Sequence, residues 1–321
     1  MKKMTAWLIT ASILIFIGGL IFVGVMTVIN WDFFKLDISK FETNNYVITE
    51  ETKNITVITK TANVKILPSD NGEFKVECYE NVKVKHTVSN ENGNLKITIH
   101  DERKWYDHIK MFSFKTPKVT VYLPENEYGE LFIKGTTGGI YISDGLKFDR
   151  VETETSTGRT TCYADVKNAL KIKVTTGGVF VENINVGSLD VWVSTGYVKI
   201  SSVNCENELS VRVSTGETKM TAVRCEKFTS KGSTGSIVLT DVIATGMINI
   251  KRSTGDIRLN ECDAESLELK TDTGDINGTL LTDKVFVYKT DTGDVKLPQT
   301  TRGGVCKIET DTGNIRITIC G

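Results

Sequence analysis

The stretch Val191–Ile200 reads VWVSTGYVKI and Ile250–Leu259 reads IKRSTGDIRL, so a Thr-Gly pair separates two alternating runs of apolar and polar residues. A period of two is typical of β-strands with one buried face. Equivalent pairs recur ten times, at intervals of 19 or 20 residues, which indicates a repeat protein. The ten glycines are Gly138, Gly158, Gly177, Gly196, Gly216, Gly235, Gly255, Gly274, Gly293 and Gly313.

The flanks of the pairs share one apolar pattern. Val198 and Ile200 follow Gly196 by two and four residues, and Leu189 and Val191 precede it by seven and five. Such coils bury their apolar residues between neighbours, and no single coil folds alone. We therefore expect an all-β chain whose repeats form a β-solenoid (β-helix-like) of about ten 19-20-residue coils. A third inward segment is expected seven residues after the glycine, at Ile184, Val203, Val223, Val242 and Leu281.

The Thr-Gly pair itself is expected to form a structural turn. Glycine takes positive φ without steric cost, which suits a sharp change of strand direction. Ser or Asp precedes most pairs, and these side chains are expected to hydrogen-bond the backbone two residues on. They are Ser194, Ser214, Ser233, Ser253, Asp272, Asp291 and Asp311.

The N-terminus has a long apolar segment. No charged residue occurs from Met4 to Trp31, and Ala6–Ile29 is almost wholly apolar. This exceeds the roughly 20 residues that span a bilayer. A secretory signal peptide has a shorter apolar region and a small-residue cleavage site, which residues 28–31 do not offer. We expect residues 6–31 to form a single-pass transmembrane helix.

Charge sets the expected orientation of this anchor. Lys2 and Lys3 precede it, so residues 1–5 are expected in the cytoplasm and the bulk of the chain outside the cell. Trp7 and Trp31 lie where interfacial aromatics belong.

We expect three segments after the anchor. They are a tether at 32–46, a less regular β part of the solenoid at 47–135, and the regular Thr-Gly repeat at 136–321. The aromatic insertion Trp105–Phe114 is expected to cap the open end of the rod.

Composition limits the possible partners. The chain has 39 basic and 40 acidic residues, which excludes a strong positive electrostatic field that would attract nucleic acid.

The seven cysteines are odd in number, which argues against a complete set of disulfides. Cys205 and Cys225 share a repeat position in consecutive coils and could bridge. No Cys-x-x-Cys spacing occurs, so zinc is not indicated.

Acidic residues form a row beside the distal turns. Asp256, Asp275, Asp294 and Asn314 each follow a ladder glycine and are expected one coil apart in this order. Arg258 and Lys296 are expected on the same outward face. One interpretation is a solvated face on which acids and bases neutralise each other. A second is a calcium site formed with Asp272, Asp291 and Asp311. A third is a pair of catalytic carboxylates of a glycosidase. No cofactor other than calcium is indicated.

Outward aromatic residues gather in the earlier coils, at Tyr141, Phe180, Trp192 and Tyr197. Either they form a contact surface for glycan or protein, or they pack under the N-terminal region. A carbohydrate-active enzyme needs aromatics and carboxylates in one groove. Here the aromatics are early and the acids late, which favours a non-catalytic protein.

The chain resembles a known family through the order of several motifs. These are Thr61–Val76 (TANVKILPSDNGEFKV), Asn94–Ile97 (NLKI), Val121–Pro124 (VYLP) and the Ser/Asp-Thr-Gly ladder. They are similar to the bacterial "putative adhesin" β-strand repeat family that includes LiaG-like envelope proteins. The resemblance covers about residues 47–319 and implies a β-solenoid, often membrane-anchored, with no established catalytic residues.

Taken together, these features predict a membrane-anchored extracellular β-solenoid that is a non-catalytic adhesin or a cell-envelope binding or stress-associated scaffold. Its expected partner is a cell-wall glycan or another envelope protein. A carbohydrate-active enzyme and a calcium-stabilised spacer are the alternatives. The chain reaches Cys320-Gly321 directly after a strand, so self-association is expected through this C-terminal edge.

Overall fold

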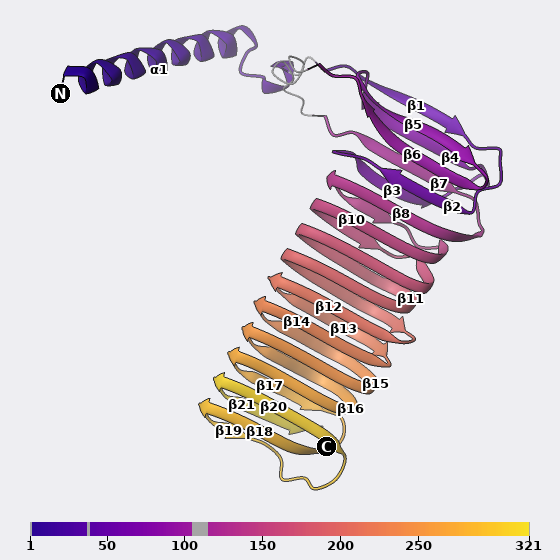
Figure 1. The fold of residues 1–321 in the computed structure, drawn as a ribbon, viewed down its shortest axis with the longest axis vertical. Helices are drawn as coiled ribbons and strands as arrows, with labels where there is room; N and C mark the ends of the chain where they lie inside the picture. Colours follow the sequence, from indigo (N-terminus) through magenta and orange to yellow (C-terminus); the bar gives the residue numbers. More distant parts are fainter. Residues whose placement is uncertain (1, 37–38, 105–114, 321) are drawn as a thin grey trace.

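The computed structural model describes residues 2–36, 39–104 and 115–320. It consists of one helix followed by a long rod of stacked β coils (Figure 1). The expected cap at Trp105–Phe114 lies outside the described residues. The all-β solenoid is confirmed.

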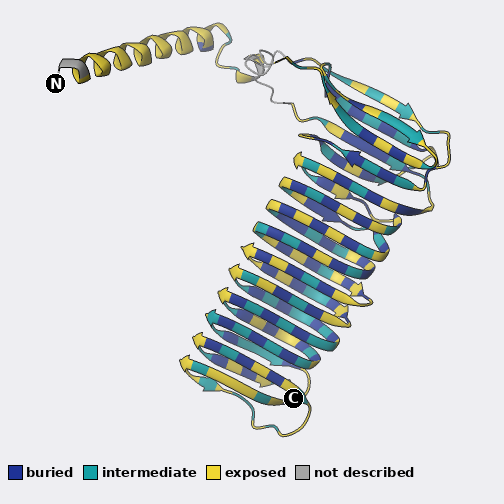
Figure 2. Ribbon diagram, viewed as in Figure 1, coloured by how far each residue is buried: buried dark blue, intermediate teal, exposed yellow. Residues whose placement is uncertain are grey.

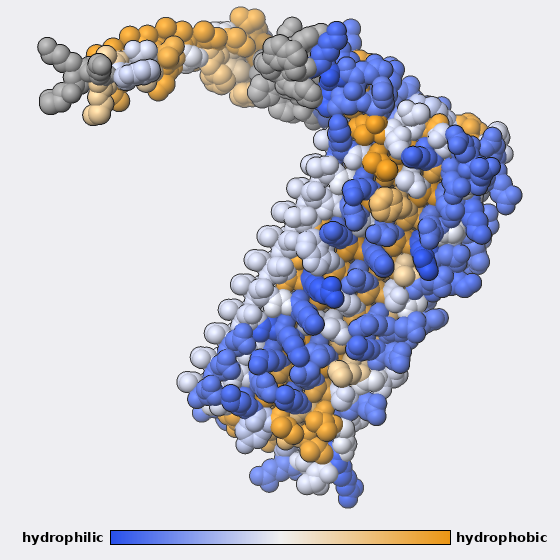
Figure 3. Space-filling view, viewed as in Figure 1, coloured by the Kyte–Doolittle hydropathy of each residue, from blue (hydrophilic) through white to orange (hydrophobic). Residues whose placement is uncertain are grey.

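Helix α1 spans Lys2–Val28 and is followed by the 3-10 helix η1, Phe33–Leu36. Residues Met4–Val28 have a mean hydropathy of 2.6, and none of the most apolar window is buried. The apolar surface of α1 contrasts with the largely polar rod in Figure 3. The helix is long and apolar enough to cross a bilayer.

The described residues of the N-terminal part of the rod contain nine strands. They are β1 (Phe41–Val47), β2 (Asn54–Ile58), β3 (Asn63–Pro68), β4 (Lys75–Asn81), β5 (Val84–Glu91), β6 (Asn94–Asp101), β7 (Lys118–Leu123), β8 (Glu127–Thr137) and β9 (Ile140–Ile142). Strand β1 pairs with β4, so strand structure begins inside the segment 32–46 that we expected to be a tether.

The remaining strands form the regular rod and are parallel to their neighbours. They are β10 (Lys147–Cys162), β11 (Asp165–Cys205), β12 (Glu208–Thr215), β13 (Thr218–Cys225), β14 (Lys227–Thr234), β15 (Ile237–Thr254), β16 (Ile257–Thr273), β17 (Ile276–Leu280), β18 (Lys284–Thr292), β19 (Val295–Lys296), β20 (Gly304–Thr312) and β21 (Ile315–Ile319).

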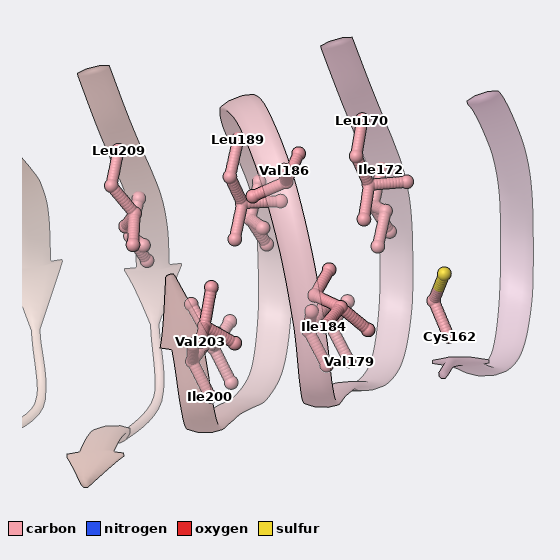
Figure 4. Packing of buried hydrophobic residues seen from close by; sticks show 14 of the residues in the cluster. Cys162, Leu170, Ile172, Val179, Ile184, Val186, Leu189, Ile200, Val203 and Leu209 are labelled. Carbon is pink, nitrogen blue, oxygen red and sulfur yellow. The ribbon is translucent and has the colours of Figure 1, made fainter. Parts of the chain in front are cut away.

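Equivalent apolar residues stack along the rod and form its core. Leu170, Leu189 and Leu209 are buried and lie in one row, one per coil (Figure 4). Buried and exposed positions alternate along most strands (Figure 2). Each coil thus covers the apolar row of the next, as expected for a solenoid.

All ten ladder glycines have positive φ, between +124° and +152°. The turns also stack closely: a Cβ on Gly196 would lie 1.6 Å from the carbonyl oxygen of Gly177. The expected need for glycine is therefore twofold, because the backbone angle and the contact with the next coil both exclude a side chain.

A different residue from the expected one hydrogen-bonds the turns. Threonines three residues before the glycine donate to a glycine carbonyl of the neighbouring coil, with Thr271 Oγ1 3.0 Å from Gly255 O and Thr310 Oγ1 3.0 Å from Gly274 O. Within residues 115–320, no Ser or Asp directly before a Thr-Gly pair bonds the backbone two residues on. Thr271 and Thr310 are buried, whereas most of the residues directly before the Thr-Gly pairs are exposed, namely Ser214, Ser233, Ser253, Asp291 and Asp311.

A second turn lies six residues after the glycine. Asn183, Ser202, Ala222, Asp241 and Glu261 all have φ between +51° and +56° there. The next residue is buried, which confirms the third inward segment at Ile184, Val203, Val223 and Val242. Leu281 was predicted wrongly and is 37 % exposed. In its coil the register shifts, and Leu280 pairs with Cys262 in the inward row.

The coils do not stack in sequence order at either end. Strands β20 and β21 lie between β16–β17 and β18–β19, so the last coil of the chain is inserted between two earlier ones. At the other end, β2 and β3 lie between β6–β7 and β8–β9.

The C-terminal strand is therefore not the edge that we expected for self-association. Strand β21 is paired on both sides, by β17 and β19. Among the described strands, β18 pairs with β20 alone. Val287 and Tyr288 of β18 are exposed, so the open edge at this end of the rod belongs to β18.

Candidate binding face

Four aromatic rings and one arginine share the outward face that follows the Thr-Gly turns. We call Tyr141, Arg159, Tyr163, Phe180 and Tyr197 the aromatic face. Four of them come from β9, β10 and β11, and Tyr163 directly follows β10. The register of these strands stacks Tyr141, Thr161 and Phe180 in one outward row. Adjacent coils lie about 4.8 Å apart, so the rings occupy neighbouring rungs.

The members of the aromatic face contact one another. The ring centroids of Tyr141 and Tyr163 are 5.8 Å apart, and those of Phe180 and Tyr197 are 5.2 Å apart at an interplanar angle of 82°. The guanidinium of Arg159 lies 4.7 Å from the Phe180 centroid, and its Nη2 donates to the Tyr197 hydroxyl at 3.3 Å. Edge-to-face and cation–π contacts hold these rings in defined orientations.

The aromatic face remains open to a ligand. Tyr141 is 36 % exposed and Tyr197 39 % exposed, while Phe180 and Tyr163 are half-buried. Lys199 and Glu182 form an ion pair beside Tyr163. An exposed platform of rings bordered by polar groups can stack on a sugar ring or accept an aromatic partner.

Trp192, the fourth aromatic residue that the sequence singled out, lies elsewhere. It stands four residues before Gly196, on the strand that leads into the turn, with Lys173 Nζ 5.5 Å from its ring centroid. The structure therefore groups Tyr141, Phe180 and Tyr197 and separates Trp192 from them.

The repeat position of Trp192 is occupied by basic residues in the following coils. Trp192 pairs with Arg212, and Lys231, Lys251 and Lys270 follow in successive coils. Lys251 Nζ is 3.1 Å from Glu268 Oε1, and Lys270 Nζ is 3.3 Å from Glu309 Oε2. Acidic side chains therefore neutralise the positive charges at the distal end of the row.

The distal acidic row forms a ladder of side chain–backbone hydrogen bonds. Asp256 Oδ1 accepts from the Asp275 N–H at 3.0 Å, and Asp275 Oδ1 accepts from the Asn314 N–H at 2.7 Å. Asn314 Oδ1 in turn accepts from the Asp294 N–H at 3.0 Å. The expected order of the row is thus wrong, because the inserted last coil places Asn314 between Asp275 and Asp294.

The second acidic row, directly before the turns, is reordered in the same way, with Asp311 between Asp272 and Asp291. Asp256 also pairs with Arg258 at 2.7 Å. These contacts are those of the solvated, neutralised face. Calcium binding by the two rows stays a prediction.

All seven cysteines are free, so Cys205 and Cys225 do not bridge. Burial raises the pKa of the thiols of Cys162, Cys225 and Cys306 to about 12. Such thiols stay protonated at neutral pH and are poor nucleophiles.

Sequence reasoning missed Arg159 and Tyr163 as members of the aromatic face. Both stand at outward positions, one and five residues after Gly158, so the repeat register was sufficient to place them. Their contacts to Tyr197 and Tyr141 cross coil boundaries, and only the structure shows them.

Three solved structures that this chain resembles are from bacteria. A "putative adhesin" from Parabacteroides merdae is 14% identical and has a TM-score of 0.46, covering 88% of this chain and 98% of that one. A "Putative lipid binding protein" from Parabacteroides distasonis is 17% identical with a TM-score of 0.46 and the same coverage. A "putative adhesin" from Bacteroides fragilis is 16% identical with a TM-score of 0.36, covering 87% and 97% of the two chains. No curated protein matches the chain.

One protein family matches the chain twice in succession. The Toastrack DUF4097 family matches residues 52–207 and again residues 204–321. The two matches together cover the whole rod from β2 onward. The chain therefore belongs to the Toastrack DUF4097 family.

Proposed function

We propose that this protein is a non-catalytic, membrane-anchored rod that binds a cell-envelope glycan through the aromatic face. The observation that carries the proposal is the set of four rings on adjacent coils, held in fixed orientations by one another and by Arg159. Rings on successive coils, about one strand separation apart, offer successive stacking and edge contacts to a linear glycan that runs along the rod.

Helix α1 supplies the anchor in this proposal. Its residues from 4 to 25 are exposed, and no acidic residue occurs in it. With Lys2 and Lys3 inside, the rod stands on the outer side of the membrane. N-terminal sequencing of the protein in isolated membranes tests this: an intact N-terminus supports an anchor, and a cleaved one shows a signal peptide.

The separation of aromatics and carboxylates supports a binding role over hydrolysis. The aromatic face lies on the coils of Gly138 to Gly196, whereas the acidic row lies on those of Gly255 to Gly313. A glycosidase needs two carboxylates close to one bound sugar. The adhesin names of the similar solved structures agree with a binding protein.

Binding of the full-length protein to purified peptidoglycan tests the proposal. We expect Tyr197→Ala and Phe180→Ala each to weaken binding about tenfold, as for a hot-spot ring that contributes about 1.4 kcal/mol. Tyr288→Ala is the matched control, because Tyr288 is an exposed tyrosine at the far end of the rod.

Two results would overturn the proposal. One is equal binding by the wild type and the aromatic-face variants, or no binding at all. The other is release of glycan fragments that stops in Asp275→Asn. The assay is run with and without calcium. If glycan binding by the wild type requires calcium and binding by Asp275→Asn does not respond to it, the acidic row is the calcium site.

A further inference from the structure

Three side chains with metal-binding chemistry meet near the end of the rod that follows α1. Cys78 and Glu80 lie on β4, and His86 lies on β5. One ligand atom of each, the thiol sulfur, a carboxylate oxygen and an imidazole nitrogen, lies within 4.8 Å of the other two. All three residues are buried. Across residues 2–36, 39–104 and 115–320, no other three residues of this kind come so close.

The backbone explains how β4 and β5 bring these residues together. The two strands pair only at Asn81 and Val84. Beyond that pair they diverge, because β4 continues between β1 and β7 while β5 pairs with β6. The cluster lies at this fork, where the usual strand-to-strand hydrogen bonds are missing.

Hydrogen bonds fix the carboxylate of Glu80. Its Oε2 lies 2.6 Å from His86 Nδ1 and accepts the backbone N–H of His86 at 2.6 Å. Its Oε1 accepts from Asn44 Nδ2 at 2.8 Å. A buried carboxylate is costly unless it is paired and hydrogen-bonded, so these contacts explain how the fold tolerates it.

The imidazole of His86 is oriented from its other side. Its Nε2 lies 3.0 Å from Thr59 Oγ1. When Nε2–H donates to this hydroxyl, the lone pair of Nδ1 points toward Glu80 and Cys78. Metal-bound histidines typically donate their second N–H to an oxygen in this way, and metal-bound carboxylates are in turn hydrogen-bonded. Thr59 and Asn44 supply these two supports.

We propose that Cys78, Glu80 and His86 bind one divalent transition-metal ion of the zinc type. Thiolate, carboxylate and imidazole are the ligands that zinc takes in proteins, and three of them leave a fourth tetrahedral position for water. A thiolate and a carboxylate balance the two positive charges of the ion.

Binding takes the proton from the Cys78 thiol and replaces the contact between His86 Nδ1 and Glu80 Oε2 by bonds from both atoms to the ion. Burial, together with the nearby Glu80 and Glu77, raises the pKa of the Cys78 thiol to about 12, so the ion must displace its proton. Tetrahedral ligands about 2.05 Å from the ion are about 3.3 Å apart, so Nδ1 and Oε2 separate by about 0.7 Å on binding. The ion then joins β4 to β5 across the fork.

Metal content of the full-length protein, purified in detergent and equilibrated with buffered zinc, tests this site. We expect about one zinc per chain in the wild type and at least a tenfold lower content in Cys78→Ser and His86→Gln. Cys162→Ser is the matched control, because Cys162 is equally buried but bonds only the Ala164 carbonyl. No zinc in the wild type, or equal zinc in all four proteins, would overturn the proposal.

A spectroscopic measurement decides the case in which Cys78→Ser does not fold. Cobalt(II) replaces zinc, and a bound thiolate gives an intense near-ultraviolet charge-transfer band in the wild-type protein. The band supports the proposal if it appears in the wild type and Cys162→Ser. Its absence from the wild type overturns it. Neither measurement uses glycan binding, so the outcome is independent of the proposed function.

Discussion

The ring of Tyr197 lies directly over Gly178 in the preceding coil. A Cβ on Gly178 would be 2.6 Å from the ring's Cζ atom and 2.8 Å from its hydroxyl oxygen. The backbone of Gly178 is not in the left-handed region, so the missing side chain serves the ring and not the chain direction. Gly178 thus positions one ring of the aromatic face.

Gly178→Ala should displace Tyr197 without unfolding the rod. We expect glycan binding to weaken about tenfold, close to the effect of Tyr197→Ala, with a change in unfolding free energy of about 1 kcal/mol or less. Isothermal titration and urea unfolding measure the two effects. If Gly178→Ala and Tyr197→Ala are combined, the losses should not add, because both act through one ring.

Adjacent glycines at the first ladder turn provide a matched pair for stability. Gly138 has φ +133°, and a Cβ there would lie 2.5 Å from the Ala62 carbonyl oxygen. On Gly139 the nearest atom would be 3.4 Å away. We expect Gly138→Ala to lower the unfolding free energy by about 3 kcal/mol and Gly139→Ala by less than about 1 kcal/mol. Equal effects in urea unfolding would show that the turn relaxes.

Arg252 lies inside the rod and is only 4 % exposed. Its Nη2 donates to Ser230 Oγ at 2.9 Å, whereas Nε and Nη1 have no hydrogen-bond partner among the described residues. Burial lowers the pKa of this guanidinium to about 10. The unfolded chain holds the proton more tightly, so the destabilisation is fully present below pH 10 and is lost as the pH rises above it.

Arg252→Met should therefore stabilise the protein at pH 7, by about 2 kcal/mol, since it removes a buried unpaired charge and keeps a long side chain. Arg258→Met, on the exposed face, should change the unfolding free energy by less than about 0.5 kcal/mol. Thermal or urea unfolding of both variants provides the comparison. A less stable Arg252→Met would mean that the guanidinium has a favourable partner inside the rod.

Asp101 gives a prediction for acid stability. Arg103 donates to its two carboxylate oxygens at 2.8 and 2.6 Å, and this pairing lowers the pKa of the Asp101 carboxyl well below its usual range. Because folding lowers this pKa, the stabilisation is present above the unfolded value of about 3.9 and is lost as the pH falls through the folded value.

We expect Asp101→Asn to cost about 1 kcal/mol at pH 7, and the difference from the wild type to shrink steadily below pH 4. Urea unfolding at several pH values measures it. Glu125→Gln, at an exposed position, serves as the control and should show no such trend. A difference that stays constant down to pH 2 would contradict the assigned ion pair.

Hydrogen exchange tests the inserted last coil. Strand β20 is paired on both sides, by β16 and β18, while β18 is paired on one side among the described strands. We expect amides of Cys306–Thr312 to exchange more slowly than those of Val285–Thr292. The opposite order would mean that the coils stack in the order of the sequence.

The repeat period predicted the features that each coil shares with every other. Gly196 and its equivalents were placed in turns because their spacing and flanks agree, and Leu189 and Val191 were placed in the core because of their alternation. These positions depend on local chain geometry, which the same residue pattern specifies in each of the ten repeats.

The period did not predict which coils become neighbours at the ends. The residues around Gly293 and Gly313 have nearly the same pattern, so either coil fits beside that of Gly274. The order is set by the long connection between β19 and β20, which no periodicity describes. For the same reason the position of Asn314 in the acidic row was wrong.

The metal-binding candidates were missed for a related reason. Cys78 and Glu80 alternate on one strand, but a regular hairpin would place Tyr79 opposite His86. The two strands instead diverge after one pair, and the backbone N–H of His86 bonds to the Glu80 side chain. Irregular departures of this kind depend on the neighbouring strands β1, β6 and β7.

The inserted coils at both ends limit how a rod of this type can change its length. Neither terminal coil in the sequence is terminal in space, since β2–β3 and β20–β21 are each enclosed by other coils. A duplicated repeat appended after Ile319 would have to pass the coil of β18 and β19 to reach the free edge of β18. Lengthening or shortening is therefore accommodated most simply between the coils of Gly158 and Gly255, in whole units of 19 or 20 residues, each changing the length of the rod by about 4.8 Å.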